Sequence, residues 1–279
     1  NVAGIDIGTA FTKAVIIAGA YDERPVVIGR GTTKTGVNIE QAAWRAFEAA
    51  LEEAQLESSD VCYIATTGFG RYGASFRDIQ ATEITSGARG AHYLFPQTTA
   101  VLDIGSQSTR AITLKEGGKV RSFKTNDKCA AGSGSFIVRA AKYLQIDLKE
   151  VGELALRSTN PQPISSICAV LAESEIINHV SAGVGVEDIL RGIYDSLADR
   201  AAMLLKRAGP LGELTFIGGL ANQPGMVKAL EERIKVKVDT PRHCEYVCAL
   251  GAALLGLRRL EATRAPRTLL RIPAMETAS

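Results

Sequence analysis

One short segment near the start of the chain carries residues that can bind a polyphosphate. It reads DIGTAFTK and begins at Asp6, and its Gly8 lets the backbone approach phosphate oxygens closely. Asp6 is placed to hold a hydrated Mg²⁺, an ion that binds few carboxylates and keeps several waters. Side chains that can donate hydrogen bonds to the phosphate come from Thr9, Thr12 and Lys13. Alone, such a segment is also typical of an ordinary hairpin with an acidic turn.

A second segment of the same design lies roughly a hundred residues further on. It reads DIGSQSTR, from Asp103 to Arg110, and its Gly105 and Ser106 are the corresponding candidates for phosphate contact. A third segment, IGGLANQ, is a strand that ends in paired glycines before a helix, so a flat base and a ribose can lie on bare backbone. Its candidate contacts are Gly218, Gly219 and Asn222.

These three segments, in this order, resemble the phosphate-1, phosphate-2 and adenosine motifs of the superfamily that contains acetate kinase, sugar kinases, Hsp70 and actin. The resemblance implies a two-domain α/β fold of the actin/hexokinase/Hsp70 (ribonuclease H-like) type with ATP in the cleft between the domains. It also implies that Asp6 and Asp103 hold Mg²⁺ or its waters. Gln107 is a candidate for orienting the attacking water, by analogy with glutamines that do so in other nucleotide hydrolases.

The elements that must position these motifs follow from the apolar pattern. Strands are expected at 2–7, 12–17, 26–28 and 61–65, with a helix at 39–54, and a second round of strands begins at 98–104. Helices are then expected at 135–144, 148–156, 169–180 and 187–205, before a strand at 214–217 and a last helix at 247–260. We expect one domain at 1–95, a second at 96–245, a helix at 246–260 that packs back on the first, and a tail at 261–279.

Bulk composition excludes several classes of function. The 279 residues are 46% hydrophobic and 22% charged, which is enough for a real core, and the net charge is only +2. No basic run of the nucleic-acid-binding kind is present, so nucleic acid is not an expected partner. No stretch of 18 apolar residues and no charged leader is visible, which favours a cytoplasmic protein without a membrane contact.

Two of the five cysteines lie in sequence surroundings that suit an anionic metal cluster. Cys129 is in the Gly-rich NDKCAAGSGSF, whose Gly132 and Gly134 are further candidates for nucleotide contact, and Cys168 directly precedes an expected helix. Positive helix ends favour thiolates. Two cysteines cannot complete a four-thiolate iron-sulfur site, so a cluster on this pair needs ligands from a second chain. On spacing alone, two small buried hydrophobes remain the simpler interpretation.

Nine segments spread over nearly the whole chain resemble the ATPases of the benzoyl-CoA reductase and 2-hydroxyacyl-CoA dehydratase activator family. They are DIGTAFTK, ATTGFGR, EITSGARGA, VLDIGSQSTR, CAAGSGSF, SSICAVLAESEI, VEDILRGI, IGGLANQ and LGAALLG. The resemblance implies that Cys129 and Cys168 bind half of a 4Fe-4S cluster at a dimer interface. It further implies that ATP hydrolysis drives a low-potential electron, with ferredoxin as the donor, into acyl-CoA reductase or dehydratase subunits.

The chain departs from the dehydratase activators at two places. Ser106, Ser108 and Arg110 stand in the second phosphate motif where DIGGQD-x-K is usual, and Ser86-Gly87 replaces a Cys-His pair. Benzoyl-CoA reductases use two different ATPase subunits, so these departures favour one subunit of such a heterodimer. The alternatives are a homodimeric activator of a 2-hydroxyacyl-CoA dehydratase and, more distantly, a small-molecule kinase such as an N-acetylhexosamine kinase, for which no persuasive catalytic base is visible.

Overall fold

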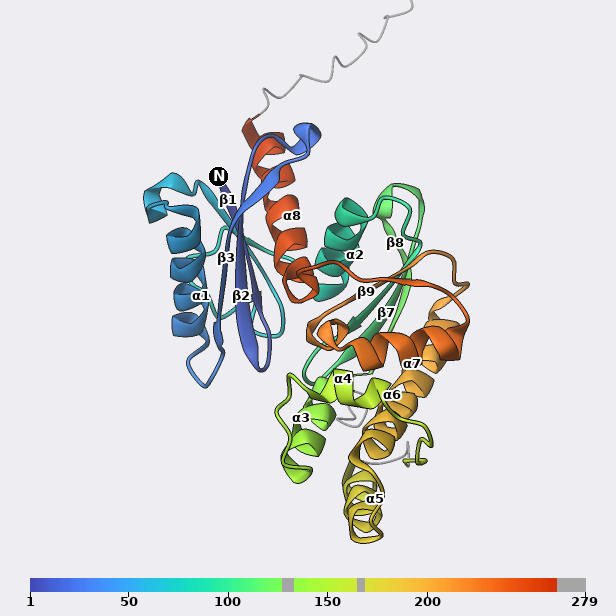
Figure 1. Ribbon diagram of the computed structural model, residues 1–279. Coiled ribbons are helices and arrows are strands. Elements are labelled where there is room, and N and C mark those ends of the chain that lie inside the picture. Colours follow the sequence, from blue (N-terminus) through green and yellow to red (C-terminus); the bar gives the residue numbers. More distant parts are fainter. Residues whose placement is uncertain (127–132, 165–168, 265–279) are drawn as a thin grey trace, which may run out of the picture.

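Two five-stranded sheets of identical topology form the framework of the molecule (Figure 1). The computed structural model describes residues 1–126, 133–164 and 169–264. The strand order is β3-β2-β1-β4-β5 in the first sheet and β8-β7-β6-β9-β10 in the second. The central strand β1 of the first sheet is antiparallel to β2 and parallel to β4. In the same way, the central strand β6 of the second sheet is antiparallel to β7 and parallel to β9. This confirms the repeat that the two DIG segments predicted.

The strands of the first sheet are β1 (Val2–Ile7), β2 (Phe11–Ala18), β3 (Val26–Lys34), β4 (Tyr63–Thr67) and β5 (Ile79–Gln80). Those of the second are β6 (Ala100–Ile104), β7 (Thr109–Leu114), β8 (Val120–Asn126), β9 (Leu214–Ile217) and β10 (Val238–Asp239). Strand β3 is longer than the expected 26–28, because its polar second half pairs with β2 as far as Lys34.

Helices cover both faces of the first sheet, which explains why β1 is buried along nearly its whole length. On one face lies α1 (Ile39–Ala54), which begins where the Asn38 side chain accepts a hydrogen bond from the Gln41 amide at 3.0 Å. On the other face lies α8 (Val247–Arg264), the last described helix of the chain. Its apolar residues pack against those of β1 and β2, in a cluster that includes Val2, Val15, Ile17, Leu250 and Leu254.

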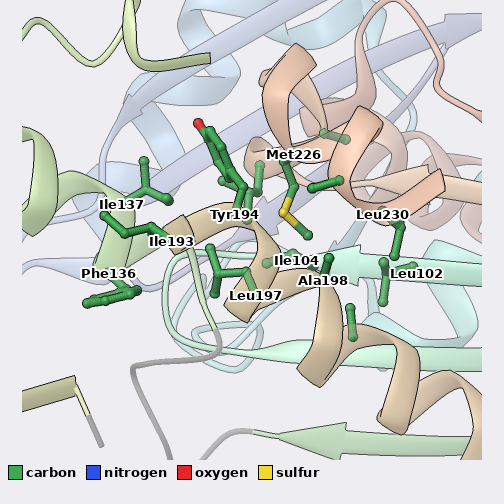
Figure 2. Close-up of a cluster of buried hydrophobic side chains, with 14 of the residues drawn as sticks. Leu102, Ile104, Phe136, Ile137, Ile193, Tyr194, Leu197, Ala198, Met226 and Leu230 are labelled. Atoms are coloured by element: carbon green, nitrogen blue, oxygen red, sulfur yellow. The ribbon is translucent and has the colours of Figure 1, made fainter. Parts of the chain in front are cut away.

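The second sheet carries a larger helical layer on one face. This layer consists of α3 (Gly134–Tyr143), α4 (Val151–Leu156), α5 (Ala169–Ser181), α6 (Val186–Ala208) and α7 (Pro224–Ile234). Figure 2 shows the core between this layer and the sheet, where Leu102 and Ile104 of β6 meet side chains of α3, α6 and α7 such as Phe136, Tyr194 and Met226. This core holds the second phosphate turn and the neighbouring helices in place.

The opposite face of the second sheet packs on α2 (Glu83–Leu94), which in turn contacts α8 (Figure 1). Five short 3₁₀ helices complete the described elements: η1 (Tyr21–Glu23), η2 (Ser58–Asp60), η3 (Glu116–Gly118), η5 (Gly219–Asn222) and η6 (Cys244–Tyr246). Helices α2 and α8 therefore lie between the two sheets and join the two halves of the molecule.

The crossing of α2 and α8 depends on two glycines. A methyl group added at Gly90 would lie 2.2 Å from the Val247 carbonyl oxygen, and one added at Gly251 would lie 1.8 Å from the Ser86 carbonyl oxygen. Both distances are far below van der Waals contact, and the obstructing atoms are backbone. The two helices can therefore approach this closely only because glycine occupies both positions.

Replacing Gly251 with Ala is expected to lower the free energy of unfolding by about 1–3 kcal/mol, because the added methyl forces the α2–α8 crossing apart. Chemical denaturation followed by circular dichroism measures this loss. Gly219→Ala is the matched control, since no heavy atom lies within 4 Å of its added methyl. Equal midpoints for the two variants would contradict the packing argument.

Candidate functional site

A cavity of about 320 Å³ lies between the two halves, at the ends of the central strands. Residues from all three predicted motifs line it. The predicted site residues among them are Asp6, Gly8, Thr9, Lys13, Asp103, Gly105, Ser106, Gly134, Gly218, Gly219 and Asn222. The structure thus brings together residues that are up to about two hundred positions apart in the sequence.

Each half contributes one carboxylate and one cation from equivalent positions. Asp6 pairs across the β1–β2 hairpin with Lys13, and Asp103 pairs across the β6–β7 hairpin with Arg110. The Lys13 Nζ atom lies 3.9 Å from Asp6 Oδ2, whereas an Arg110 guanidinium nitrogen lies 2.9 Å from Asp103 Oδ2. All four side chains are at most 18% exposed, so their charges act on one another with little screening by solvent.

Each carboxylate also lies against a bare glycine that follows the neighbouring parallel strand. Gly68 follows β4 and Gly218 follows β9, with φ angles of +92° and +89°. A methyl group at either glycine would come within 2.6 Å of an oxygen of Asp6 or Asp103, respectively. Glycine is required at both places, for the backbone conformation and for the space beside the carboxylate.

The two phosphate turns close with the same backbone hydrogen bond. The Gly8 amide donates to the Phe11 carbonyl at 3.2 Å, and the Gly105 amide donates to the Ser108 carbonyl at 2.9 Å. The first turn of α3 is fixed to the second phosphate turn, because the Gly134 amide donates to the Gly105 carbonyl at 2.9 Å. The N-terminal end of α3, which carries a partial positive charge, therefore lies at the cavity.

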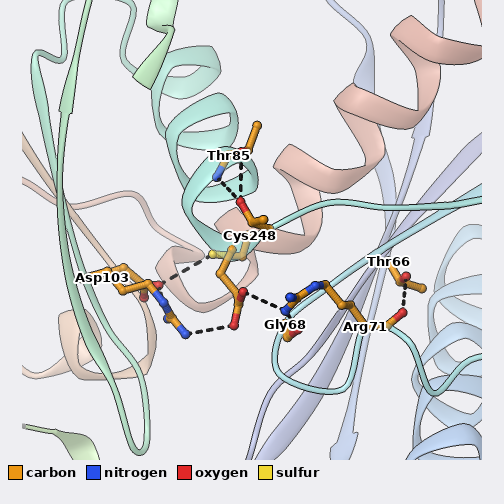
Figure 3. A network of polar contacts seen from close by, with 9 residues as sticks. Thr66, Gly68, Arg71, Thr85, Asp103 and Cys248 are labelled. Carbon is orange, nitrogen blue, oxygen red and sulfur yellow. Dashed lines mark hydrogen bonds and ion pairs between the residues drawn. The ribbon is translucent and has the colours of Figure 1, made fainter. Parts of the chain in front are cut away.

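A chain of charged side chains runs along one wall of the cavity, and Glu83, Asp103 and Arg110 are part of the lining (Figure 3). The carboxylate of Glu83, the first residue of α2, lies 3.0 Å from Arg110 and 3.3 Å from Arg71. Arg71 also donates to the Gly68 carbonyl at 3.1 Å, and the Cys248 thiol lies 3.9 Å from Asp103 Oδ2. The wall therefore joins residues of both halves.

Burial and neighbouring charges shift the ionisation of several groups in this wall. Burial raises the pKa of Asp6, and the Asp103 carboxylate adds to that rise while Lys13 opposes it. Burial alone would lower the pKa of Arg110, but Asp103 and Glu83 outweigh it and raise the pKa. Burial, together with Asp103 and Asp6, raises the pKa of the Cys248 thiol well above its usual range. Cys248 is therefore a neutral thiol at neutral pH.

Apolar residues also line the cavity and offer a surface that suits a flat ring. Among them are Ile137, Val138, Leu148 and Leu220. At the rim of the cavity the side-chain amide of Asn222 donates to Glu245 Oε2 at 3.0 Å. These apolar side chains can stack against a nucleotide base, and the Asn222 amide and the Glu245 carboxylate can form hydrogen bonds with a ribose.

The structure does not bring every predicted residue to the cavity. Thr12 is fully buried outside the lining, with its hydroxyl 2.9 Å from that of Thr35, which donates to the Gly8 carbonyl. This arrangement fits a role in shaping the turn. Gln107 is exposed at the β6–β7 turn and is not part of the lining. Cys129, Cys168 and Gly132 lie outside the described residues.

Several residues that line this cavity were not among the predicted site residues. Glu83, Glu245 and Cys248 line the cavity but come from outside the three motifs, and Arg110 was noted only as a departure from a motif. Thr82, whose side chain caps α2 by accepting from the Thr85 amide at 3.2 Å, is the one local signal that places Glu83 at a helix start. Nothing in the sequence alone places that helix start beside Asp103.

Comparison with known proteins identifies the chain. Residues 3–256 match the model of the BadF/BadG/BcrA/BcrD ATPase family. The chain belongs to this family. It is 43% identical over 265 residues to one of the subunits of benzoyl-CoA reductase from Thauera aromatica, covering 93% of this chain and 94% of the relative. It is 36% identical over 252 residues to the 2-hydroxyisocaproyl-CoA dehydratase activator of Clostridioides difficile, covering 90% and 92%.

Solved structures agree with the family assignment. The activator of 2-hydroxyisocaproyl-CoA dehydratase from Clostridium difficile, solved with bound ADPNP, superposes with a TM-score of 0.88 and 33% identity, over 94% of this chain and 96% of that one. The fold is of the two-domain actin/hexokinase/Hsp70 type, as sequence analysis predicted, and distant hexokinase structures share it. Within the described part of this ATPase-family chain, no helix has the length and hydropathy needed to cross a bilayer.

Proposed function

We propose that this ATPase-family chain couples ATP hydrolysis in the interdomain cavity to the transfer of a low-potential electron into an acyl-CoA reductase of the benzoyl-CoA reductase type. The observation that carries the proposal is the 43% identity to the Thauera aromatica benzoyl-CoA reductase polypeptide across nearly the whole chain. The cavity geometry supports the nucleotide part, because it combines two phosphate turns with apolar side chains that can stack against the base.

The residues of the cavity suit ATP and Mg²⁺. Asp6 and Asp103 supply the carboxylate oxygens that Mg²⁺ prefers, and the bare backbone of Gly68 and Gly218 leaves room beside each of them. Bound there, Mg²⁺ neutralises phosphate charge. Lys13 donates to the phosphate oxygens, and the first turn of α3 adds its partial positive charge. Phosphoryl transfer needs mainly positioning and charge stabilisation, and these groups are held rigidly enough to provide both.

The electron-transfer part of the proposal rests on the family resemblance of the two cysteine segments. Cys129 and Cys168 would hold half of a 4Fe-4S cluster, and a second ATPase subunit would supply the other two thiolates. Such a cluster supplies a one-electron carrier of low potential. Because both cysteines lie outside the described residues, their fit to a cluster rests on the sequence alone.

The helix that follows Cys168 has a surface suited to a second subunit. Ile177 and Val180 of α5, which are three positions apart and therefore neighbours on one face of the helix, are each 50% exposed although both are large and apolar. Apolar residues gathered on one exposed helix are typical of interfaces between subunits. We propose that a homologous ATPase subunit covers this face of α5, and we favour a heterodimer.

A homodimeric activator of a 2-hydroxyacyl-CoA dehydratase is the second candidate. The similarity to the 2-hydroxyisocaproyl-CoA dehydratase activator, at a TM-score of 0.88, favours it. The two functions share ATP hydrolysis and the bridging cluster, and they differ in the acceptor and in the identity of the second subunit. The electron donor in either case is proposed to be a ferredoxin.

The proposal predicts about four irons and four sulfides per pair of chains after purification without oxygen. The chain is purified alone and after co-expression with a second ATPase subunit and acyl-CoA reductase subunits, and dithionite-reduced samples are examined by EPR. Electron transfer to benzoyl-CoA that requires ATP would support the reductase function, whereas ATP-dependent activation of a dehydratase would support the second candidate. Iron-free protein in both preparations, with ATP turnover on a sugar, would instead indicate a kinase.

A further inference from the structure

We propose that Glu83 is a positioning residue for ATP hydrolysis, which fixes the Arg110 guanidinium at the cavity wall and ties its position to Arg71 in the other half of the molecule. The inference rests on the proposed use of the cavity as the ATP site. It assigns a role to a side chain that belongs to none of the three nucleotide motifs.

The two oxygens of Glu83 have different partners. Oε1 lies 3.0 Å from one terminal nitrogen of Arg110, and Oε2 lies 3.3 Å from a terminal nitrogen of Arg71. The Glu83 side chain is 17% exposed and starts a helix capped by Thr82, so its backbone position is fixed. A half-buried carboxylate at the start of a capped helix, with two guanidinium partners, can hold both of them in defined orientations.

The two arginines belong to different halves of the molecule. Arg71 is anchored on the first half, where it donates to the Gly68 carbonyl and its own carbonyl accepts from Thr66 Oγ1 at 2.7 Å (Figure 3). Arg110 is on β7 of the second sheet and pairs with Asp103. Glu83 therefore links the glycine beside Asp6 to the cation beside Asp103, across the cavity.

The repeat shows what Glu83 adds. Lys13 and Arg110 occupy equivalent positions in the two hairpins, yet Lys13 pairs with one carboxylate at 3.9 Å, while Arg110 pairs with two, at 2.9 Å and 3.0 Å. The planar fork of an arginine can engage two carboxylates at once, which the point charge of a lysine does less well. Lys13 therefore keeps hydrogen-bond donors that are available to a phosphate. Arg110 is already held in one orientation, so it can stabilise the negative charge that develops on the phosphate in the transition state with little reorganisation.

Removing the charge of Glu83 should separate binding from catalysis. In Glu83→Gln the cavity loses one negative charge, so the attraction for a polyphosphate is not weakened. Arg110 keeps only Asp103 as a charged partner and loses its connection to Arg71. Its guanidinium can then move away from the orientation needed in the transition state, and misplacement by about 1 Å can cost up to a hundredfold in rate.

The test compares Glu83→Gln with the wild type, both purified without oxygen with their cluster and partner. The kcat for ATP hydrolysis is expected to fall about tenfold to a hundredfold, while the Kd of a non-hydrolysable ATP analogue, measured by calorimetry, does not increase. Glu53→Gln is the matched control, because Glu53 pairs with Arg30 on the surface at 3.7 Å. That control should leave both quantities unchanged.

A second variant keeps the test independent of folding defects in the first. Arg71→Met should lower kcat several-fold, and the double variant should fall no further than Glu83→Gln alone, because both changes break the same link. An unchanged kcat in Glu83→Gln, or parallel losses of rate, affinity and Tm, would overturn the positioning role. Failure of the wild type to bind the analogue would instead reject the proposed ATP site.

Discussion

Cys129→Ser or Cys168→Ser is expected to remove the iron from the purified protein and abolish electron transfer, while the Kd of a non-hydrolysable ATP analogue stays the same. A serine oxygen is a poor ligand for an iron-sulfur cluster, and each cluster shared by two chains has no spare thiolate to replace the lost one. Iron and sulfide analysis, EPR and calorimetry on the same preparations measure the three quantities.

Cys62→Ser is the matched control for this experiment. Cys62 is exposed just before β4, and its thiol donates to the Asn1 carbonyl. Its loss should change neither iron content nor electron transfer. If Cys129→Ser or Cys168→Ser kept about four irons per pair of chains, the cluster would be held elsewhere and the proposed function would fail.

Asp103→Asn is expected to lower the kcat for ATP hydrolysis by about 10²–10³-fold, a loss typical of removing one preorganised electrostatic group from an active site. Asp103 is 4% exposed, and its charge both pairs with Arg110 and offers oxygen to Mg²⁺. The amide keeps the shape of the side chain but removes that charge. Steady-state hydrolysis measured over a range of Mg²⁺ concentrations tests the expectation.

Asp195→Asn is a suitable comparison, because Asp195 forms an ion pair of similar length, 2.8 Å, with Arg191 but is 41% exposed on α6. It should leave kcat within about twofold, as exposed ion pairs contribute little. Equal rates for Asp103→Asn and the wild type at saturating Mg²⁺ would contradict a role for Asp103 in the site.

Much of the framework could be predicted from the sequence, because local patterns decided it. The paired DIG segments revealed the repeat, and the helix at 39–54 was confirmed residue for residue, since its apolar positions follow helical spacing with an Asn cap. Helix α2 was not among the elements that the apolar pattern predicted. Its Gly87 and Gly90 lower helix propensity, and Gly90 is needed for close packing against α8, a tertiary requirement that no local pattern displays.

The site was predictable as far as its residues belong to repeated motifs. The seven-residue spacing from Asp6 to Lys13 recurs from Asp103 to Arg110, and both pairs meet at the cavity. Thr12, like its neighbours Thr9 and Lys13, has a side chain that can donate a hydrogen bond. It nevertheless points away from the cavity, because successive residues of a strand point to opposite faces of the sheet. The proposed role of Glu83 could not be predicted from the sequence, because it depends on Arg71 and Arg110, which lie in different halves of the molecule.

Synthesis of the chain from its N-terminus places a constraint on its folding that follows from the position of α8. The first sheet is made within the first 80 residues, but the helix that covers its second face emerges only after residue 246. Until then Val2, Val15 and Ile17 lack the apolar side chains of α8, such as Leu250 and Leu254, that cover them in the folded chain. During synthesis, the face of the first sheet that α8 later covers is therefore exposed to solvent. Packing of this face is completed only after α8 has been synthesised.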